Sequence, residues 1–137
     1  MKVFVDSNVP MYVAGREHKL REPARRFLAR VRAGEVEACT STEVLQEILH
    51  RYVGLKRPDL AHEVYELFVR LCPVVLPVAL ADTDRARDLL RAVPSLSVRD
   101  AIHAGVALNH DVAAIASFDR GFDAIDGIER LRLESEA

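Results

Sequence analysis

The sequence lacks the features that identify several large classes of protein. Among its 137 residues there is no tryptophan, only 6% are aromatic, and there are two cysteines. Its longest apolar runs fall far short of the roughly 20 residues that a membrane span needs. Cys39 and Cys72 form no CxxC pair and lie in apolar surroundings, so we expect buried free thiols in a reducing cytoplasm. These absences argue against a membrane protein and a disulfide framework.

Several catalytic motifs are missing as well. The chain contains no GxGxxG, P-loop or GxSxG motif, so a nucleotide-binding or serine-hydrolase function has no support. Its histidines show no HExxH or other paired spacing, which argues against a zinc site. His103 follows Asp100 by three residues, and we interpret it as a helix-surface residue rather than a base.

The composition is that of a globular domain. Half of the residues are hydrophobic and 29% are charged, and the length suits one domain spanning residues 1–137. The first residues reach Asp6 directly after Val3-Phe4-Val5, which is unlike a secretory signal. The net charge of −2 gives no hint of nucleic acid, but the segment from Arg16 to Arg32 is strongly basic. That segment is either a polyanion-binding surface or a solvated helix face.

Short apolar runs alternate with longer stretches of helical period. We expect strands at residues 3–5, 36–39, 74–76, 113–116 and 128–133. Helices are expected from about residue 8, over 20–34, 42–54, 59–71 and 81–93, and from residue 97. This alternation predicts an α/β fold with a mostly parallel sheet of four to five strands and helices on both faces.

Three helix starts carry capping signals. Thr40-Ser41-Thr42-Glu43 is typical of a capping box, which gives Glu43 a structural role. Asp59 follows Pro58 and is expected to cap the next helix. Ser97-Val98-Arg99-Asp100 is an S-x-x-D box that opens a further helix.

Two acidic residues follow expected strands directly. Asp6 ends the first strand, and Asp119 follows the fourth in Ala116-Ser117-Phe118-Asp119. In open parallel sheets the ligand cleft lies beyond the carboxyl ends of the strands, so both are candidate site residues. A turn or capping role is the alternative for each.

Two further acids belong to helices. Asp100 would lie in a first helical turn, where capping is the structural alternative. Glu47 is one turn beyond Glu43 and is either an exposed residue or an acid that points into the cleft. Carboxylates about 4 Å apart repel by roughly 4 kcal/mol at an effective dielectric near 20, so converging acids would bind protons or a cation. Oxygen ligands favour Mg²⁺ or Mn²⁺.

Four motifs in chain order resemble those of PIN-domain nucleases. The length of the chain is similar to that of the VapC toxins of type II toxin–antitoxin pairs. They are Val3-Phe4-Val5-Asp6-Ser7-Asn8-Val9, Thr40-Ser41-Thr42-Glu43-Val44-Leu45-Gln46-Glu47-Ile48, Ser97-Val98-Arg99-Asp100-Ala101-Ile102-His103-Ala104 and Ala114-Ile115-Ala116-Ser117-Phe118-Asp119-Arg120-Gly121-Phe122. The resemblance implies a three-layer α/β/α sandwich, a homodimer, Mg²⁺-dependent RNA cleavage and an antitoxin that blocks the site.

The resemblance also implies roles for individual residues. Asp6, Asp100 and Asp119 would hold the metal, and Glu47 would be a further ligand or would orient the attacking water. Asn8 and Ser117 match polar positions that support the ligands. Asp123 lies close enough to Asp119 to leave the fourth acid open.

The resulting hypothesis is metal-assisted hydrolysis of RNA phosphodiester bonds in the cytoplasm. Arg99 and Arg120 are each adjacent to a proposed ligand and are candidates for phosphate contacts or plain surface residues. A phosphatase of the haloacid dehalogenase type is one alternative, although Asp6-Ser7-Asn8 lacks the second acid of Asp-x-Asp. A catalytically inert module that binds RNA or protein is the other.

Overall fold

The computed structural model describes residues 1–135; the last two residues of the domain predicted over 1–137 lie outside the described residues. The strands are β1 (Lys2–Val5), β2 (Glu37–Ser41), β3 (Val74–Leu76), β4 (Ala114–Ala116) and β5 (Glu129–Leu131). The α-helices are α1 (Asn8–Ala14), α2 (Arg21–Arg32), α3 (Thr42–Gly54), α4 (Pro58–Leu71), α5 (Leu80–Ala92) and α6 (Val98–Asn109). Two 3₁₀ helices, η1 (Arg120–Ala124) and η2 (Leu133–Ser135), flank β5.

The five strands form one sheet in the order β3-β2-β1-β4-β5, and every neighbouring pair is parallel. The central strand β1 pairs with β2 on one side and with β4 on the other, with Val5 opposite Ala116. The predicted parallel α/β fold is therefore confirmed. Because the strands are parallel, all their carboxyl ends meet at one edge of the sheet.

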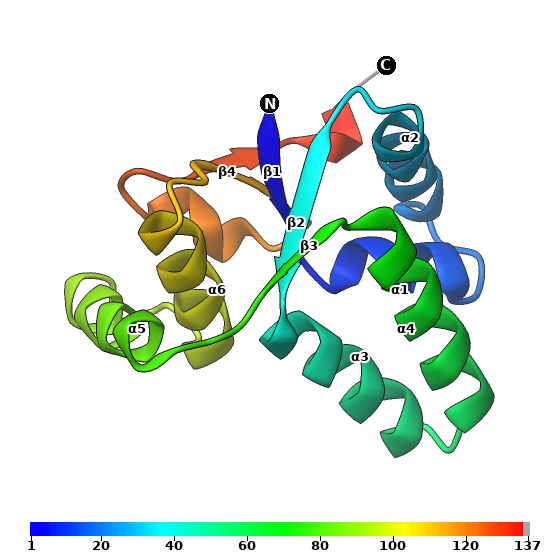
Figure 1. Ribbon diagram of the computed structural model, residues 1–137, viewed down its shortest axis with the longest axis horizontal. Coiled ribbons are helices and arrows are strands. Elements are labelled where there is room, and N and C mark those ends of the chain that lie inside the picture. The colour runs from blue at the N-terminus through cyan, green and yellow to red at the C-terminus, as the bar shows by residue number, and fades with distance from the viewer. Residues whose placement is uncertain (136–137) are drawn as a thin grey trace.

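Helices cover both faces of this sheet. In Figure 1, α5 and α6 pack together on one side, while α1, α2 and α4 lie on the other, and α3 extends beyond the carboxyl end of β2. The result is the predicted α/β/α sandwich. None of the helices among residues 1–135 has the length and apolar character that a bilayer crossing requires.

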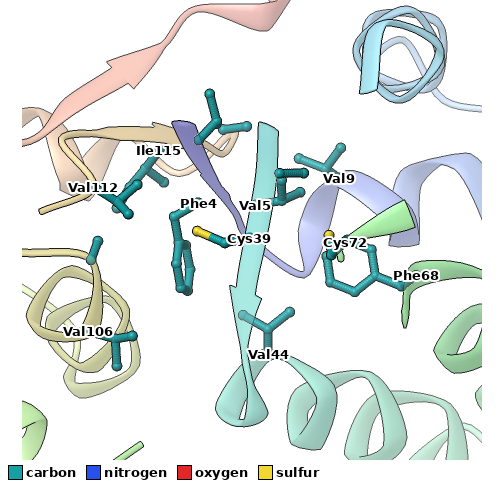
Figure 2. Close-up of a cluster of buried hydrophobic side chains, with 14 of the residues drawn as sticks. Phe4, Val5, Val9, Cys39, Val44, Phe68, Cys72, Val106, Val112 and Ile115 are labelled. Carbon is teal, nitrogen blue, oxygen red and sulfur yellow. The ribbon is translucent and has the colours of Figure 1, made fainter. Parts of the chain in front are cut away.

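The core consists of two apolar layers separated by β1. Figure 2 shows Phe4 pointing toward the side of Val106 in α6, whereas Val5 points to the opposite side, toward Val9 and Phe68. This alternation follows from the two-residue repeat of a strand. All five side chains are fully buried. Both faces of β1 are thus fixed by packing, which holds the residue that follows it, Asp6, in a defined place.

The two cysteines belong to the core, as predicted. Cys39 and Cys72 are buried free thiols. Burial raises the pKa of Cys39 to about 11 and that of Cys72 to about 12, so both are protonated at neutral pH. They act as small apolar side chains.

The helix starts agree only in part with the capping signals. Ser97 caps α6 as predicted, since its Oγ accepts a hydrogen bond from the Asp100 N–H at 3.1 Å. The predicted capping box at residues 40–43 is wrong, because Ser41 is the N-cap of α3 and makes no side-chain cap. The predicted cap at Asp59 is also wrong. Arg57 is the N-cap of α4, and Asp59 lies inside the first turn with its carboxylate on the Arg57 guanidinium.

Helix α6 approaches the backbone of α5 closely at Gly105. A Cβ at this position would lie 2.7 Å from the backbone oxygen of Asp82 and 3.3 Å from the backbone nitrogen of Ala86. Backbone atoms cannot move aside as a flexible side chain can. Gly105 therefore sets the distance between the two helices.

We expect Gly105→Ala to destabilise the protein by about 1–3 kcal/mol, because the added methyl group overpacks a rigid contact. Gly54→Ala is the matched control, since nothing lies within 4 Å of its added Cβ. Thermal unfolding followed by circular dichroism compares the two. Equal melting temperatures for both variants would contradict the close contact.

Candidate active site

Four acidic residues predicted from the sequence converge at the carboxyl edge of the sheet. Asp6 follows β1, Glu47 lies in the second turn of α3, Asp100 lies in the first turn of α6, and Asp119 follows β4. The first three are buried, with exposed fractions of 4%, 8% and 3%, and Asp119 is half-buried. Asp6, Glu47 and Asp119 line a cleft of about 1410 Å³ between α1, α3 and α6. The prediction that these acids share one site agrees with this geometry.

Asn8 and Ser117 connect Asp6 to the loop that carries Asp119. The Ser117 hydroxyl donates to Asp6 Oδ2 at 2.7 Å and accepts from the Asp119 N–H at 3.0 Å. The Asn8 amide donates to the same hydroxyl at 3.1 Å. The backbone N–H of Ser7 donates to Asp6 Oδ1 at 2.7 Å. These bonds fix the Asp6 carboxylate, so Asn8 and Ser117 lie where the sequence motifs place supporting residues.

Asp100 and Asp119 form a coupled pair beside Gly121. Burial is the main reason that the pKa of Asp100 rises to about 7, and the carboxylates of Asp119 and Asp6 raise it further. A hydrogen bond from Asp100 lowers the pKa of Asp119. A Cβ on Gly121 would lie 3.1 Å from Asp100 Oδ2 and 3.2 Å from Asp119 Oδ1, so a larger residue would push into both carboxyl groups. The two carboxyl groups therefore shift each other's pKa in opposite directions.

His103 is part of this cluster, and its interpretation as a surface residue is wrong. Its side chain is fully buried, and Nε2 lies 2.5 Å from Glu47 Oε1 and 3.6 Å from Asp6 Oδ1. The close contact is poorly aligned, because neither Nε2 nor Oε1 has a hydrogen-bond partner of good geometry. Glu47 Oε2 accepts from the Ser7 hydroxyl at 2.9 Å. The imidazole therefore packs against two of the acids.

The environment of His103 affects its charge in two opposing ways. Burial is the largest influence and lowers the pKa of His103, but Glu47, Asp6 and Asp100 together outweigh it and leave the pKa raised. A signal for this residue exists in the sequence. Asp100, His103, Ala104 and Ala107 follow the spacing of one helix face, and all four are buried. His103 is buried because it lies on this helix face. Its spacing of three residues from Asp100 does not by itself indicate burial.

Of the two arginines predicted as phosphate contacts, the structure brings only one to the cleft. Arg99 lines it, lies 3.6 Å from Glu47 Oε2 and remains 59% exposed. Arg99 also contributes to the lowered pKa of Asp119. Arg120 is exposed and is not among the residues that line the cleft.

Asp123, the alternative to Asp119 as the fourth acid, is paired with Arg130 and does not line the cleft. Its carboxylate accepts hydrogen bonds from Arg130 Nε at 2.9 Å and Nη2 at 3.3 Å. Arg130 Nη1 also donates to the backbone oxygen of Ser117 at 3.2 Å. The buried guanidinium of β5 thereby ties together both ends of the loop that carries Asp119. Sequence reasoning missed this residue because nothing nearby in the chain marks it.

We expect Arg130→Ala to destabilise the protein by about 1–3 kcal/mol, since it leaves the buried Ser117 carbonyl without its charged donor. Arg132→Ala is the matched control, because that side chain is exposed and its substitution should stay within about 0.5 kcal/mol. Chemical denaturation measures both. If the two variants unfold at the same denaturant concentration, Arg130 is not the anchor of the loop.

The basic residues from Arg16 to Arg32 do not all lie on one surface. Arg16 lines the cleft, whereas none of the basic residues of α2 does. Within α2, Arg25 and Arg30 lie 3.8 Å from Glu22 and 3.5 Å from Glu35. The solvated helix face is therefore the interpretation that fits α2.

The acid cluster has the properties of a cation site. Asp6, Glu47 and His103 each offer one ligand atom, and these atoms all lie within 4.8 Å of one another. Glu47 Oε1 and both ring nitrogens of His103 are buried without hydrogen-bond partners. Buried carboxylates that lie this close together are costly unless a cation or proton joins them. Carboxylate oxygens suit a hard divalent ion, so the residues present fit such an ion.

The chain matches known proteins over most of its length. Residues 3–128 match the PIN domain family. The chain is 42% identical over 129 residues to Ribonuclease VapC13 of Mycobacterium tuberculosis, covering 94% of this chain and 98% of that protein. It is 38% identical to Ribonuclease VapC23 of the same species, covering 85% of this chain and 92% of that protein.

Solved structures agree with this fold. The complex FitAcB from Neisseria gonorrhoeae superposes with a TM-score of 0.76 at 17% identity, covering 98% of this chain and 99% of the matched chain. VapC20 of M. tuberculosis, described as a toxin that cleaves the sarcin–ricin loop, gives a TM-score of 0.72 at 20% identity, covering 89% and 93%. With a family match over residues 3–128 and relatives of 42% and 38% identity over most of the chain, this chain belongs to the PIN-domain family.

Proposed function

We propose that this protein is a divalent-metal-dependent endoribonuclease of the VapC type. The observation that carries the proposal is the convergence of four acids, from chain segments up to 113 residues apart (Asp6 to Asp119), of which Asp6, Glu47 and Asp119 line one open cleft. The identity to proteins named ribonucleases supports RNA as the substrate.

The proposed ligands are Asp6, Asp100 and Asp119, with Glu47 as a further ligand or as the group that orients water. When bound, Mg²⁺ or Mn²⁺ would neutralise the scissile phosphate and lower the pKa of the attacking water. Ser117 and Asn8 hold the Asp6 carboxylate in place. Arg99 is exposed at the cleft wall and is the proposed phosphate contact.

His103 completes the proposed machinery as a positioning residue. Its ring packs against Glu47 and Asp6 in a space closed to solvent. The imidazole therefore restricts the rotamers of Glu47, whose other oxygen is already held by Ser7. Glu47 is thereby kept directed into the cleft rather than out to solvent.

The partner that we propose is a cognate antitoxin. Several solved structures with this fold are VapBC toxin–antitoxin complexes, including one from Salmonella typhimurium. The cleft is the surface that an antitoxin would have to cover to stop cleavage. We further propose a homodimer in the cytoplasm, with contacts through the α5–α6 side of the molecule, where Leu80 and Val98 are 77% and 62% exposed.

The proposal is tested by incubating the purified protein with a mixture of structured and single-stranded RNA. We expect cleavage in MgCl₂ or MnCl₂, none in EDTA, and recovery when the ion is restored. Isothermal titration of each ion into metal-free protein shows which ion binds and with what stoichiometry. A protein that binds neither ion and cleaves no RNA would be the inert binding module.

The phosphatase alternative is less compatible with the site. In that chemistry a second acid two residues after the first donates and accepts protons. Here the position is Asn8, whose amide is committed to the Ser117 hydroxyl. No phosphorylated Asp6 is therefore expected after incubation with a phosphate ester.

A further inference from the structure

Three aromatic rings, Phe118, Tyr12 and His18, form a ladder that ends at the wall of the cleft. Phe118, which directly precedes Asp119, packs edge-on against Tyr12 of α1, with ring centroids 5.3 Å apart and planes at 87°. Tyr12 in turn faces His18, with centroids 4.8 Å apart and planes at 31°. Tyr12 and His18 both line the cleft. The ladder thus leads from the acid-bearing loop outward along the cleft.

The outermost ring is held in a fixed orientation. The backbone N–H of Leu20 donates to His18 Nδ1 at 3.1 Å, which places the proton of the neutral ring on Nε2. His18 is exposed, whereas Tyr12 and Phe118 are half-buried beneath it. One face of the imidazole therefore rests on Tyr12, and the ring remains open to a ligand in the cleft.

The charges around the ladder favour a nucleic acid as that ligand. Arg16 lines the same wall two residues before His18, and Arg99 lines the cleft beside Glu47. An exposed ring beside cationic side chains is the arrangement that binds single strands, because bases stack on the ring while the cations attract phosphates.

We propose that the Phe118–Tyr12–His18 ladder is a stacking site for an unpaired base of the RNA substrate, close to the phosphate that is cleaved. This inference rests on the proposed ribonuclease function and adds to it a preference for single-stranded RNA. The base stacks on His18, Tyr12 supports the other face of that ring, and Phe118 supports Tyr12. Paired bases cannot reach the ring without leaving their helix.

The test compares His18→Ala with His18→Phe, which keeps a flat ring but removes its nitrogens. Binding of a fluorescein-labelled single-stranded RNA dodecamer is measured by anisotropy in EDTA, and KM and kcat are measured in MgCl₂. We expect His18→Ala to weaken binding and raise KM by about 5- to 50-fold with little change in kcat. His18→Phe is expected to recover most of the affinity. Binding of the same sequence as a duplex should not respond to either change.

His62→Ala is the matched control, because His62 is exposed on α4 and does not line the cleft. Unchanged single-stranded RNA binding and KM in His18→Ala would overturn the inference. The three rings would then be a candidate surface for a protein partner. Equal losses in His18→Ala and His18→Phe would also overturn it, since a ring would then not be what matters. If the parent protein cleaves no RNA yet its binding in EDTA responds to His18 as expected, the ribonuclease proposal fails while the stacking site stands. Absence of RNA binding in EDTA by a parent protein that also lacks cleavage overturns both.

Discussion

Asp6→Asn is expected to reduce metal-dependent RNA cleavage by at least about 100-fold, because it removes a charged ligand from the centre of the acid cluster. The Asn amide oxygen can still accept from the Ser7 N–H, and its NH₂ group would face the Ser117 hydroxyl, which can accept as well as donate, so the fold should survive. Cleavage of labelled RNA under single-turnover conditions measures the loss. Titration of Mn²⁺ into the same variant should show weakened binding.

Asp84→Asn serves as the control for this substitution. It makes the same chemical change on the exposed face of α5, away from the residues that line the cleft. Its cleavage rate should equal that of the parent protein. Retention of parent-like cleavage by Asp6→Asn would remove the basis of the proposed mechanism.

Asp100→Asn is expected to stabilise the metal-free protein even though it removes a metal ligand. The pKa of Asp100 rises to about 7 in the folded protein, against roughly 3.9 for an unfolded chain. The folded state therefore holds this proton more tightly, so ionisation costs stability as the pH rises from about 4 to about 7. The full cost is present above pH 7. The amide of the variant carries no charge, so the variant does not lose this stability as the pH rises.

The size and the sign of this effect can be measured together. We expect about 1–2 kcal/mol of added stability at pH 8 in EDTA, reduced by water in the cleft, which raises the melting temperature by a few degrees. The advantage should shrink toward pH 5. With MgCl₂ the order should reverse, because only the parent protein gains the stabilisation that comes with binding. A variant with a lower melting temperature than the parent at pH 8 in EDTA would show that ionised Asp100 does not destabilise the folded protein.

The sequence is sufficient to predict the fold because short strand segments, several of them apolar, alternate with longer segments of helical period and are bounded by turn or helix signals. It also predicts the acid cluster, since Asp6 and Asp119 each follow a parallel strand and so must lie at the same edge of the sheet. Glu47 was ambiguous from the sequence. Only the packing of α3 shows that its side chain is buried and directed toward Ser7.

Other features depend on tertiary contacts that local patterns do not encode. His103 is buried because α6 turns that face toward the cluster, where the carboxylates of Asp6 and Glu47 lie against its ring. Arg130 reaches Asp123 and Ser117 from another strand. At residues 40–43 the strand β2 continues to Ser41, so the backbone passes directly into α3 without the expected capping bonds.

The anchoring of the Asp119 loop by Arg130 has a consequence for newly made protein. The guanidinium that fixes this loop comes from β5, which follows all four acids in the chain. A chain still on the ribosome exposes Asp6 and Glu47 early, but the last acid is fixed only after β5 has emerged and joined the sheet. A nascent chain that stops before β5 therefore lacks the side chain that anchors the Asp119 loop.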